Sequence, residues 1–293
     1  MSNLKYIIYN EPLLAVGNKI FSCGGCIALY SLFNDLKKIG EKVYLSHPAE
    51  QFILGLEPFV VEDFFNKDET PLEDCVTIYP EITSGNPMNS KHVVRWLLHY
   101  PDYQLGRGSE TWREDDLLFA YAPWIIKETK ERGHKVEGQI LKTLHINYDI
   151  FKDRKEPRKG TCYTVRKGGE GERDQLPLGA VDISNTIEEG DPYSIAGIFN
   201  QYENFYSYDG RTTLSSLAAL CGCNSVIACR SEPKEAFFAG QLDFWKYGIA
   251  YGANDIDHAR TTRHLLKDAL EKEKESCLSS VKNFIIHTKE NFK

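Results

Sequence analysis

Residues 4–46 read LKYIIYNEPLLAVGNKIFSCGGCIALYSLFNDLKKIGEKVYLS, and this stretch decides the fold. The β-forming residues Leu4–Tyr9 predict a strand, which a glycine-containing loop follows. Four apolar residues then recur at the spacing of one helix face: Leu29, Leu32, Phe33 and Leu36. Gly40 ends the predicted helix, and Lys42–Ser46 returns as a strand. A strand, helix and strand of this length predict a parallel pair with a right-handed crossover.

The pattern of strands and helices continues along the chain. Further strands are predicted at Cys75–Tyr79, Leu117–Tyr121, Gln139–His145, Thr161–Val165, Val181–Ser184 and Ser225–Cys229. Helices are predicted at 89–97, Lys127–Arg132, Thr213–Leu220 and from about Ile256 onward. Between Lys152 and Arg173 the chain turns basic, with eight Lys/Arg against four Asp/Glu, which indicates a linker. The fold class expected is therefore α/β, with two Rossmann-like domains facing a cleft, at residues 1–152 and 153–260, and C-terminal helices at 261–293.

Composition narrows the class of protein. The 293 residues are 42% hydrophobic and 26% charged, as in a soluble globular protein, and the net charge of −7 argues against a broad nucleic-acid surface. The longest nearly apolar run, Leu117–Ile126, contains Pro123 and is half the ~20 residues of a membrane span. Because no secretory signal is visible, we expect a cytoplasmic protein with reduced thiols. The net charge predicts no nucleic-acid partner. The basic linker could contact an anionic membrane surface.

Three segments could bind an anion or a sugar. Gly24-Gly25 opens the first helix, where exposed amides and the helix dipole favour an anion or a hydroxyl; a tight turn is the alternative. A second segment precedes the later helix and could seat a pyrophosphate: Tyr208, Asp209, Gly210, Arg211, Thr212 and Thr213. Thr212 or Thr213 could also simply cap that helix. Arg166 and Lys167 follow a predicted strand and suit a diphosphate, unless they form a solvated basic loop.

Glu81 is the predicted general base. It follows a strand in Tyr79-Pro80-Glu81-Ile82, where a proline and a turn would hold its carboxylate. An ordinary cap or salt bridge is the alternative for Glu81. His47, also at a strand end, competes for the same role, as do His92 and His99. We expect His47 and Asn86 to contact the acceptor, which is the substrate whose hydroxyl the base would deprotonate.

The cysteines leave a different chemistry open. Cys23-Gly-Gly-Cys26 precedes a helix, as in dithiol redox centres, and Cys221-Gly-Cys223 could join it in binding zinc if the loops meet. Burial as small apolar residues is the more common state of such cysteines. We expect no metal and no cofactor.

Several segments taken in order resemble GT-B glycosyltransferases. Gly24-Gly25 with Leu36–Val43 resembles the opening of that family, and Ile146–Phe151 resembles the segment at its domain junction. Two later segments resemble its phosphate-binding strand end and its alanine-cysteine-glycine block: Cys162–Gly168 and Ala218–Val226. Tyr79–Ile82 through Val93–Leu98 resembles a block of glycosyltransferases that build bacterial and viral surface polysaccharides.

The resemblance implies transfer of a sugar from a nucleotide-sugar donor to a glycan or glycoconjugate acceptor. It places the donor on the C-terminal domain and the acceptor on the N-terminal domain. Leu217 stands where the family often has a ribose-binding glutamate, and Asn224 replaces a usual proline, so donor recognition should differ. A non-catalytic binding protein on the same scaffold and a thiol oxidoreductase using Cys23 and Cys26 are the alternative functions.

Overall fold

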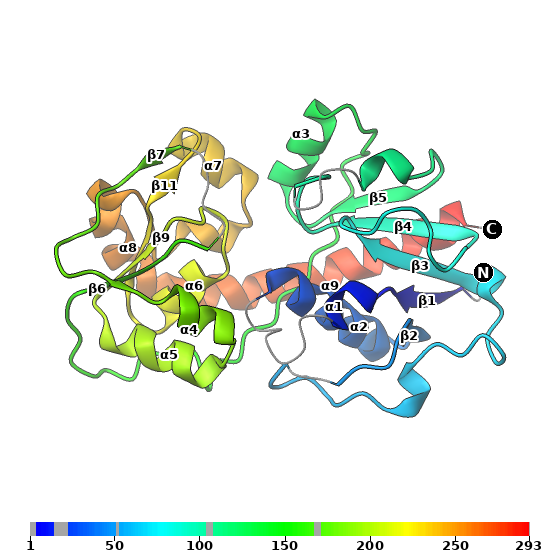
Figure 1. Ribbon diagram of the computed structural model, residues 1–293, viewed down its shortest axis with the longest axis horizontal. Coiled ribbons are helices and arrows are strands. Elements are labelled where there is room, and N and C mark those ends of the chain that lie inside the picture. Colours follow the sequence, from blue (N-terminus) through cyan, green and yellow to red (C-terminus); the bar gives the residue numbers. More distant parts are fainter. Residues whose placement is uncertain (1–3, 15–22, 51–52, 104–107, 167–170, 293) are drawn as a thin grey trace. The chain divides into compact units, whose positions relative to one another are not determined.

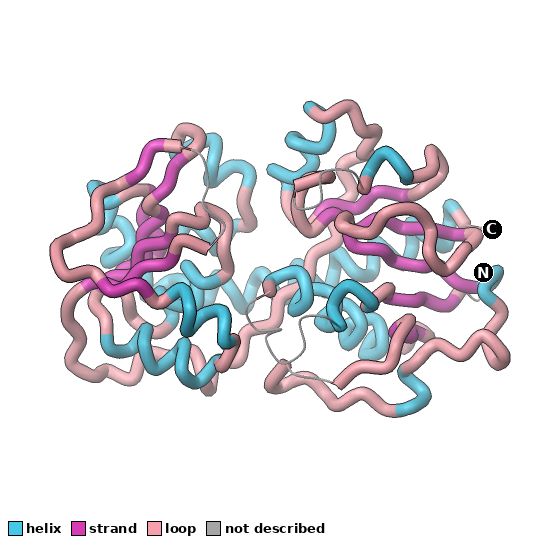
Figure 2. Tube along the Cα trace, viewed as in Figure 1, coloured by secondary structure: helices cyan, strands magenta, loops and turns pink. Residues whose placement is uncertain are grey.

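The computed structural model describes residues 4–14, 23–50, 53–103, 108–166 and 171–292 (Figures 1 and 2). The chain forms two compact units. The first contains Met1–His145 and Lys274–Lys293, and the second contains Ile146–Glu273. The first unit is therefore built from both ends of the sequence.

A five-stranded sheet forms the centre of the first unit. Its strands are β1 (Lys5–Ile8), β2 (Val43–Leu45), β3 (Cys75–Pro80), β4 (His92–Leu97) and β5 (Leu117–Ala120). They lie in the order β2-β1-β3-β4-β5, and every neighbouring pair is parallel. The order reverses direction between β1 and β3. In open α/β sheets, ligands bind outside the carboxyl ends of the strands at such a switch point.

Helix α2 (Gly24–Ile39) connects β1 to β2 and confirms the predicted opening. Its four predicted apolar residues are buried, because they form the face that packs on the sheet. Gly40 ends the helix with a left-handed φ of 93°, and its amide donates to the carbonyls of Leu36 and Lys37. The other helices of this unit are α1 (Glu11–Leu14), α3 (Pro123–Glu131) and the last part of α9 (Leu266–Asn291).

The end of α9 completes the core of the first unit. Phe284 lies 5.6 Å from the Tyr6 ring and 4.9 Å from the Phe119 ring, measured between centroids. The Tyr6 hydroxyl hydrogen-bonds Thr288 at 2.8 Å. The predicted C-terminal helices at 261–293 do not stand apart from the two units, because α9 begins in the second unit and ends within the first.

The second unit repeats the strand order of the first. Its parallel strands are β6 (Thr161–Thr164), β8 (Val181–Asp182), β9 (Asn204–Ser207), β10 (Asn224–Ile227) and β12 (Ile249–Tyr251). They lie in the order β12-β10-β9-β6-β8, so the switch point falls between β6 and β9. The helices are α4 (Ser184–Glu189), α5 (Pro192–Gln201), α6 (Leu214–Leu220), α7 (Lys234–Gly240) and α8 (Ile256–Thr262). Strands β7 (Glu172–Arg173) and β11 (Cys229–Arg230) form a separate antiparallel pair.

The α/β class is confirmed, and two of the predicted elements are wrong. The predicted helix at 89–97 is strand β4, because a strand covered on both faces shows a continuous apolar run instead of alternation. The predicted strand at Gln139–His145 makes only an isolated bridge between Ile140 and Ala120. Across the described ranges, every helix is too short or too polar to cross a bilayer.

Candidate functional site

The carboxyl edge of the second sheet brings together two segments that the sequence analysis singled out. Strands β6 and β9 are neighbours, with Thr164 opposite Ser207. Beyond this pair, the Tyr208 amide still donates to the Thr164 carbonyl at 3.0 Å. Arg166 and Asp209 each follow their strand by two residues, so both start from the switch point. Lys167, the other predicted cation, lies outside the described residues.

Hydrogen bonds within the chain shape the start of the Tyr208–Thr213 segment. The buried Tyr208 hydroxyl donates to the Asp174 carbonyl at 2.7 Å, and burial raises the pKa of this phenol. Asp209 forms a turn, in which its carboxylate accepts the Arg211 amide at 3.3 Å. Tyr208 and Asp209 therefore hold the segment in place, which leaves contact with a ligand mainly to the residues after them.

Arg211, Thr212 and Thr213 lie at the start of α6 (Leu214–Leu220), where they make contacts within the chain. The Arg211 guanidinium pairs with the Glu232 carboxylate and lies 5.3 Å from the Phe237 ring centroid. An anion at this edge would therefore compete with Glu232 for Arg211. Of the two threonines considered as caps of α6, Thr212 accepts the Leu214 amide with its hydroxyl at 3.3 Å, whereas Thr213 makes no side-chain cap.

Further ion pairs cross this edge from loops that the sequence analysis did not connect. Arg230 pairs with Asp174 at 2.7 Å, and the same carboxylate accepts the Ala253 amide at 2.8 Å. Lys234 pairs with Asp255 at 2.7 Å. These partners are between 21 and 79 residues apart, so no local sequence pattern predicts the pairs.

At the carboxyl edge of the first sheet, Glu81 lies where it was predicted. Its side chain is largely buried, and its carboxylate accepts the Leu98 amide at 3.0 Å. This bond joins the loops after β3 and β4. A Cβ added at Gly25 would lie 3.5 Å from Leu98 Cδ1, so the start of α2 reaches the same place. The edge therefore gathers Gly25, Glu81 and Leu98, three positions far apart in sequence.

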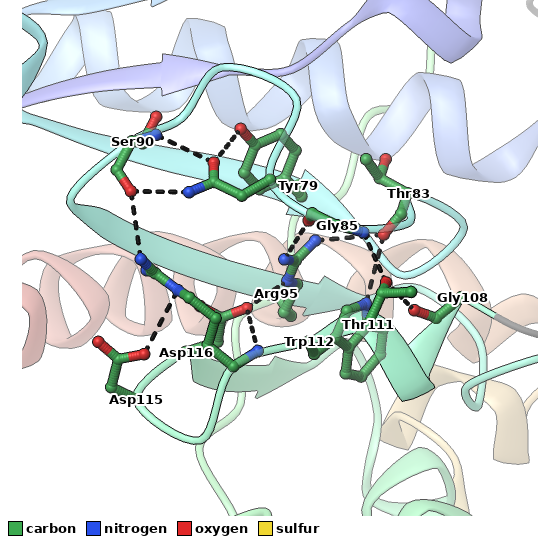
Figure 3. A network of polar contacts seen from close by, with 12 residues as sticks. Tyr79, Thr83, Gly85, Ser90, Arg95, Gly108, Thr111, Trp112, Asp115 and Asp116 are labelled. Carbon is green, nitrogen blue, oxygen red and sulfur yellow. Dashed lines mark hydrogen bonds and ion pairs between the residues drawn. The ribbon is translucent and has the colours of Figure 1, made fainter.

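Asn86 stabilises a turn in the loop between β3 and β4. Its side-chain oxygen accepts the Tyr79 hydroxyl at 2.8 Å and the Ser90 amide at 3.0 Å, and its amide donates to the Ser90 carbonyl at 2.8 Å (Figure 3). These bonds use most of the hydrogen-bonding capacity of the side chain. Asn86 is therefore a structural residue in this state of the molecule, and its predicted acceptor contact stays a prediction.

Arg95 on β4 holds the same loop from below and was missed by the sequence analysis (Figure 3). Its fully buried guanidinium donates to Asp116 at 2.8 Å, to the Thr83 carbonyl at 3.2 Å and to the Gly85 carbonyl. It also lies over the rings of Tyr79 and Trp112. Burial lowers its pKa, while Asp116 opposes this effect. A single arginine inside an apolar run was the available signal.

The three histidines considered as bases lie in different places. His47 follows β2 at the carboxyl edge, where its Nδ1 lies 2.8 Å from Ser46 Oγ. His99 follows β4, and its ring stacks on Tyr103 with centroids 3.8 Å apart. His92 begins β4 at the opposite edge and packs against Phe292, so it cannot serve this site.

The cysteines are free thiols and are mostly buried. A hydrogen bond with Cys23, together with burial, raises the pKa of the Cys26 thiol, which disfavours the reactive thiolate. Cys221 and Cys223 are buried, and the Cys223 thiol donates to the Phe199 carbonyl at 2.9 Å. Within the described ranges, the structure gathers no group of three His, Cys, Asp or Glu side chains that could hold a metal ion.

Comparison with known proteins adds no assignment to this geometry. No protein-family model matches the chain, and none of the curated protein sequences matches it.

Proposed function

We propose that the chain transfers a sugar from a nucleotide-diphosphate donor to a hydroxyl of a glycan or glycoconjugate acceptor, without a metal. The donor binds the second unit and the acceptor binds the first. One observation carries the proposal: β6 and β9 bring Arg166 and the Tyr208–Thr213 segment to the switch point of the second sheet. The ordered resemblance to GT-B glycosyltransferases supports it.

The chemistry of the donor explains why cations are useful at this edge. The diphosphate leaves with growing negative charge, which a fixed cation stabilises more in the transition state than in the ground state. Arg166 and Arg211 would supply this charge. Arg211 pairs with Glu232, so binding of a donor would transfer the guanidinium from a carboxylate to a phosphate.

A binding protein without catalysis is the second candidate function, and Leu217 is the observation that favours it. This residue occupies the position of the ribose-binding glutamate in the resemblance, and it is buried within α6. An apolar buried side chain cannot hydrogen-bond a ribose hydroxyl. Turnover separates the two candidates, because a binding protein is stabilised by a ligand but neither hydrolyses nor transfers the sugar.

Calorimetric titration of the whole chain with a panel of nucleoside diphosphates and nucleotide sugars tests the proposal. Arg211→Met should weaken binding of the best ligand about tenfold or more, because a charge-assisted bond is lost. Glu232→Gln should strengthen binding, because the competing carboxylate loses its charge. Arg260→Met is the matched control, since Arg260 is exposed and pairs only with the exposed Asp257 among the described residues. Equal affinities for all four proteins would contradict the proposed donor site.

A further inference from the structure

A buried asparagine holds His47 at the carboxyl edge of the first sheet. Asn10 follows β1 and is fully buried, and its side chain hydrogen-bonds both the backbone amide and the carbonyl of His47. Its Nδ2 donates to the His47 carbonyl at 3.0 Å, and its Oδ1 accepts the His47 amide at 2.8 Å. Because backbone amides only donate and carbonyls only accept, these two bonds fix which atom of the Asn10 side chain is the oxygen.

The hydroxyl proton of Ser46 is fixed by the same oxygen. Ser46 Oγ lies 3.0 Å from Asn10 Oδ1, an atom that can only accept, so the hydroxyl must donate there. Ser46 Oγ also accepts a hydrogen bond from the backbone amide of Asn10 at 3.1 Å. The hydroxyl has one proton, and that proton is now used. Ser46 can therefore only accept in its contact with the His47 ring.

The tautomer of His47 follows from this accounting. Its Nδ1 lies 2.8 Å from Ser46 Oγ, so Nδ1 must carry the proton that joins them. In the neutral ring Nε2 then has the lone pair. The structure gives Nε2 no hydrogen-bond partner among the residues that it describes, and His47 is only half-buried. Its ring meets Tyr9 edge-on, with centroids 5.8 Å apart.

The hydrogen bonds of Asn10 and Ser46 orient a single side chain, that of His47. Asn10 uses both of its polar side-chain atoms on Ser46 and His47. A buried asparagine whose oxygen and nitrogen are both hydrogen-bonded favours a single arrangement, because leaving either atom unpaired would be costly. This arrangement leaves Nε2 of the half-buried imidazole without a hydrogen-bond partner among the described residues. Glu81, the predicted base, instead uses one carboxylate oxygen to accept the Leu98 amide.

We propose that His47 is the general base for the acceptor hydroxyl, and that Asn10 and Ser46 are positioning residues that set its tautomer. This inference rests on the proposed function. The Nε2 lone pair takes the hydroxyl proton while the acceptor oxygen forms a bond to the anomeric carbon of the donor. The bond from that carbon to the diphosphate oxygen breaks, and the diphosphate leaves with the electron pair. The imidazolium then returns its proton to water, and the anomeric centre is inverted.

Nitrogen-15 NMR of the histidine rings in the whole chain tests the tautomer without any substrate. The wild-type protein at pH 8 should show His47 protonated on Nδ1, with the signal assigned through its absence in His47→Gln. Ser46→Ala removes the only described acceptor of Nδ1–H, so the population protonated on Nε2 should rise. A wild-type His47 protonated mainly on Nε2 would overturn the inference and leave the proposed function standing.

Single-turnover transfer assays test the catalytic role. His47→Asn keeps a side-chain amide near the position of Nδ1–H and lacks the Nε2 acceptor, so it should lower the rate of transfer about 100-fold or more. Donor affinity should stay unchanged, because the donor binds the second unit. His264→Gln, an exposed histidine of the second unit, is the control and should keep the wild-type rate.

The outcomes separate the two proposals. A wild-type transfer rate in His47→Asn would overturn the assignment of the base but not the transferase. Absence of transfer by the wild-type chain, with nucleotide binding intact, would overturn the transferase and the base together, and would favour the binding protein. A reduced rate in Ser46→Ala that follows the change in tautomer population would support the positioning role.

Discussion

The carboxyl edges of the two sheets share one strand order and are built from different interactions. At the first edge, Asn10, Ser46 and Glu81 make hydrogen bonds to backbone or neutral groups, and the fully buried pair of Arg95 and Asp116 supports the loop beside them. At the second edge, partly exposed ion pairs connect the loops: Arg211 with Glu232, Arg230 with Asp174, and Lys234 with Asp255.

In the proposed function, this difference lets one topology serve two kinds of ligand. Neutral hydrogen-bonding groups held by buried partners can fix the direction of a hydroxyl. Cations paired with nearby carboxylates can change partners when an anion arrives. The backbone order fixes where a ligand binds, whereas the loops decide which ligand binds.

The largest expected effect is at Arg95. Arg95→Met leaves the buried Asp116 carboxylate with only the partly exposed Arg113, 3.0 Å away, as an ion-pair partner, and removes a buried donor from the carbonyls of Thr83 and Gly85, so the free energy of unfolding should fall by about 3 kcal/mol. Lys234→Met at the second edge should change it by about 0–1 kcal/mol, because that pair is partly exposed. Urea denaturation measures both.

A double variant makes the contrast sharper. Arg95→Met with Asp116→Leu should lose less stability than Arg95→Met alone, since the buried carboxylate is removed together with its buried partner. Equal losses for Arg95→Met and Lys234→Met would show that the two edges are held in the same way.

A smaller effect is expected at Gly252, which begins the loop after β12. Its φ of 93° is left-handed, and an added Cβ would lie 2.5 Å from Nη1 of Arg230. Gly133 in the first unit has a φ of 87° and open space around it. Gly133→Ala should therefore show only the backbone cost of about 1–2 kcal/mol, and Gly252→Ala should exceed it by displacing Arg230. Thermal unfolding compares the two, and equal losses would mean that Arg230 moves aside freely.

The smallest effect concerns Asp102 in the loop after β4. Burial raises the pKa of its carboxyl, but hydrogen bonds from the Ser109 side chain and from the Ser109 and Gly108 amides outweigh this and leave the pKa below its ordinary value. A lowered pKa in the folded state gives stability that is present above about pH 4 and is lost as the pH falls through the folded pKa.

The test for Asp102 is a conservative variant that tolerates its φ of 64°. Asp102→Asn should lower the free energy of unfolding by about 0.5–1 kcal/mol at pH 7, because asparagine readily adopts left-handed backbone but lacks the charge and one of the two oxygens that accept from Ser109. The difference between the two proteins should shrink as the pH is lowered below about 4. A difference that does not depend on pH would assign the loss to packing.

Sequence patterns correctly predicted the elements that are determined by residues close together in the chain. Helix α2 has a buried apolar face and a glycine end, and both can be read from neighbouring residues. Strand β4 was mistaken for a helix because Val93, Val94, Trp96 and Leu97 also fit helical spacing. Only its place between β3 and β5 decides between the two, and that depends on residues far away in sequence.

The candidate site shows the same limit. The predicted strand ends showed that Glu81 and His47 would lie at the carboxyl edge of one sheet and Arg166 at that of the other, because the carboxyl ends of parallel strands share an edge. Their partners could not be predicted: Asn10 reaches His47 across 37 residues, and Glu232 reaches Arg211 across 21. Pairing over such distances is set by the folded loops and leaves no periodic signal in the sequence.

Helix α9 has a consequence for synthesis of the protein. Val281, Phe284 and Ile285 belong to the core around β1 and α2, although they are made more than 240 residues after either element. A nascent chain cannot complete the first unit until these residues leave the ribosome. The second unit, whose residues are contiguous, can fold while the first still exposes part of its sheet. Until α9 arrives, the first unit lacks part of its core and leaves apolar residues of its sheet exposed.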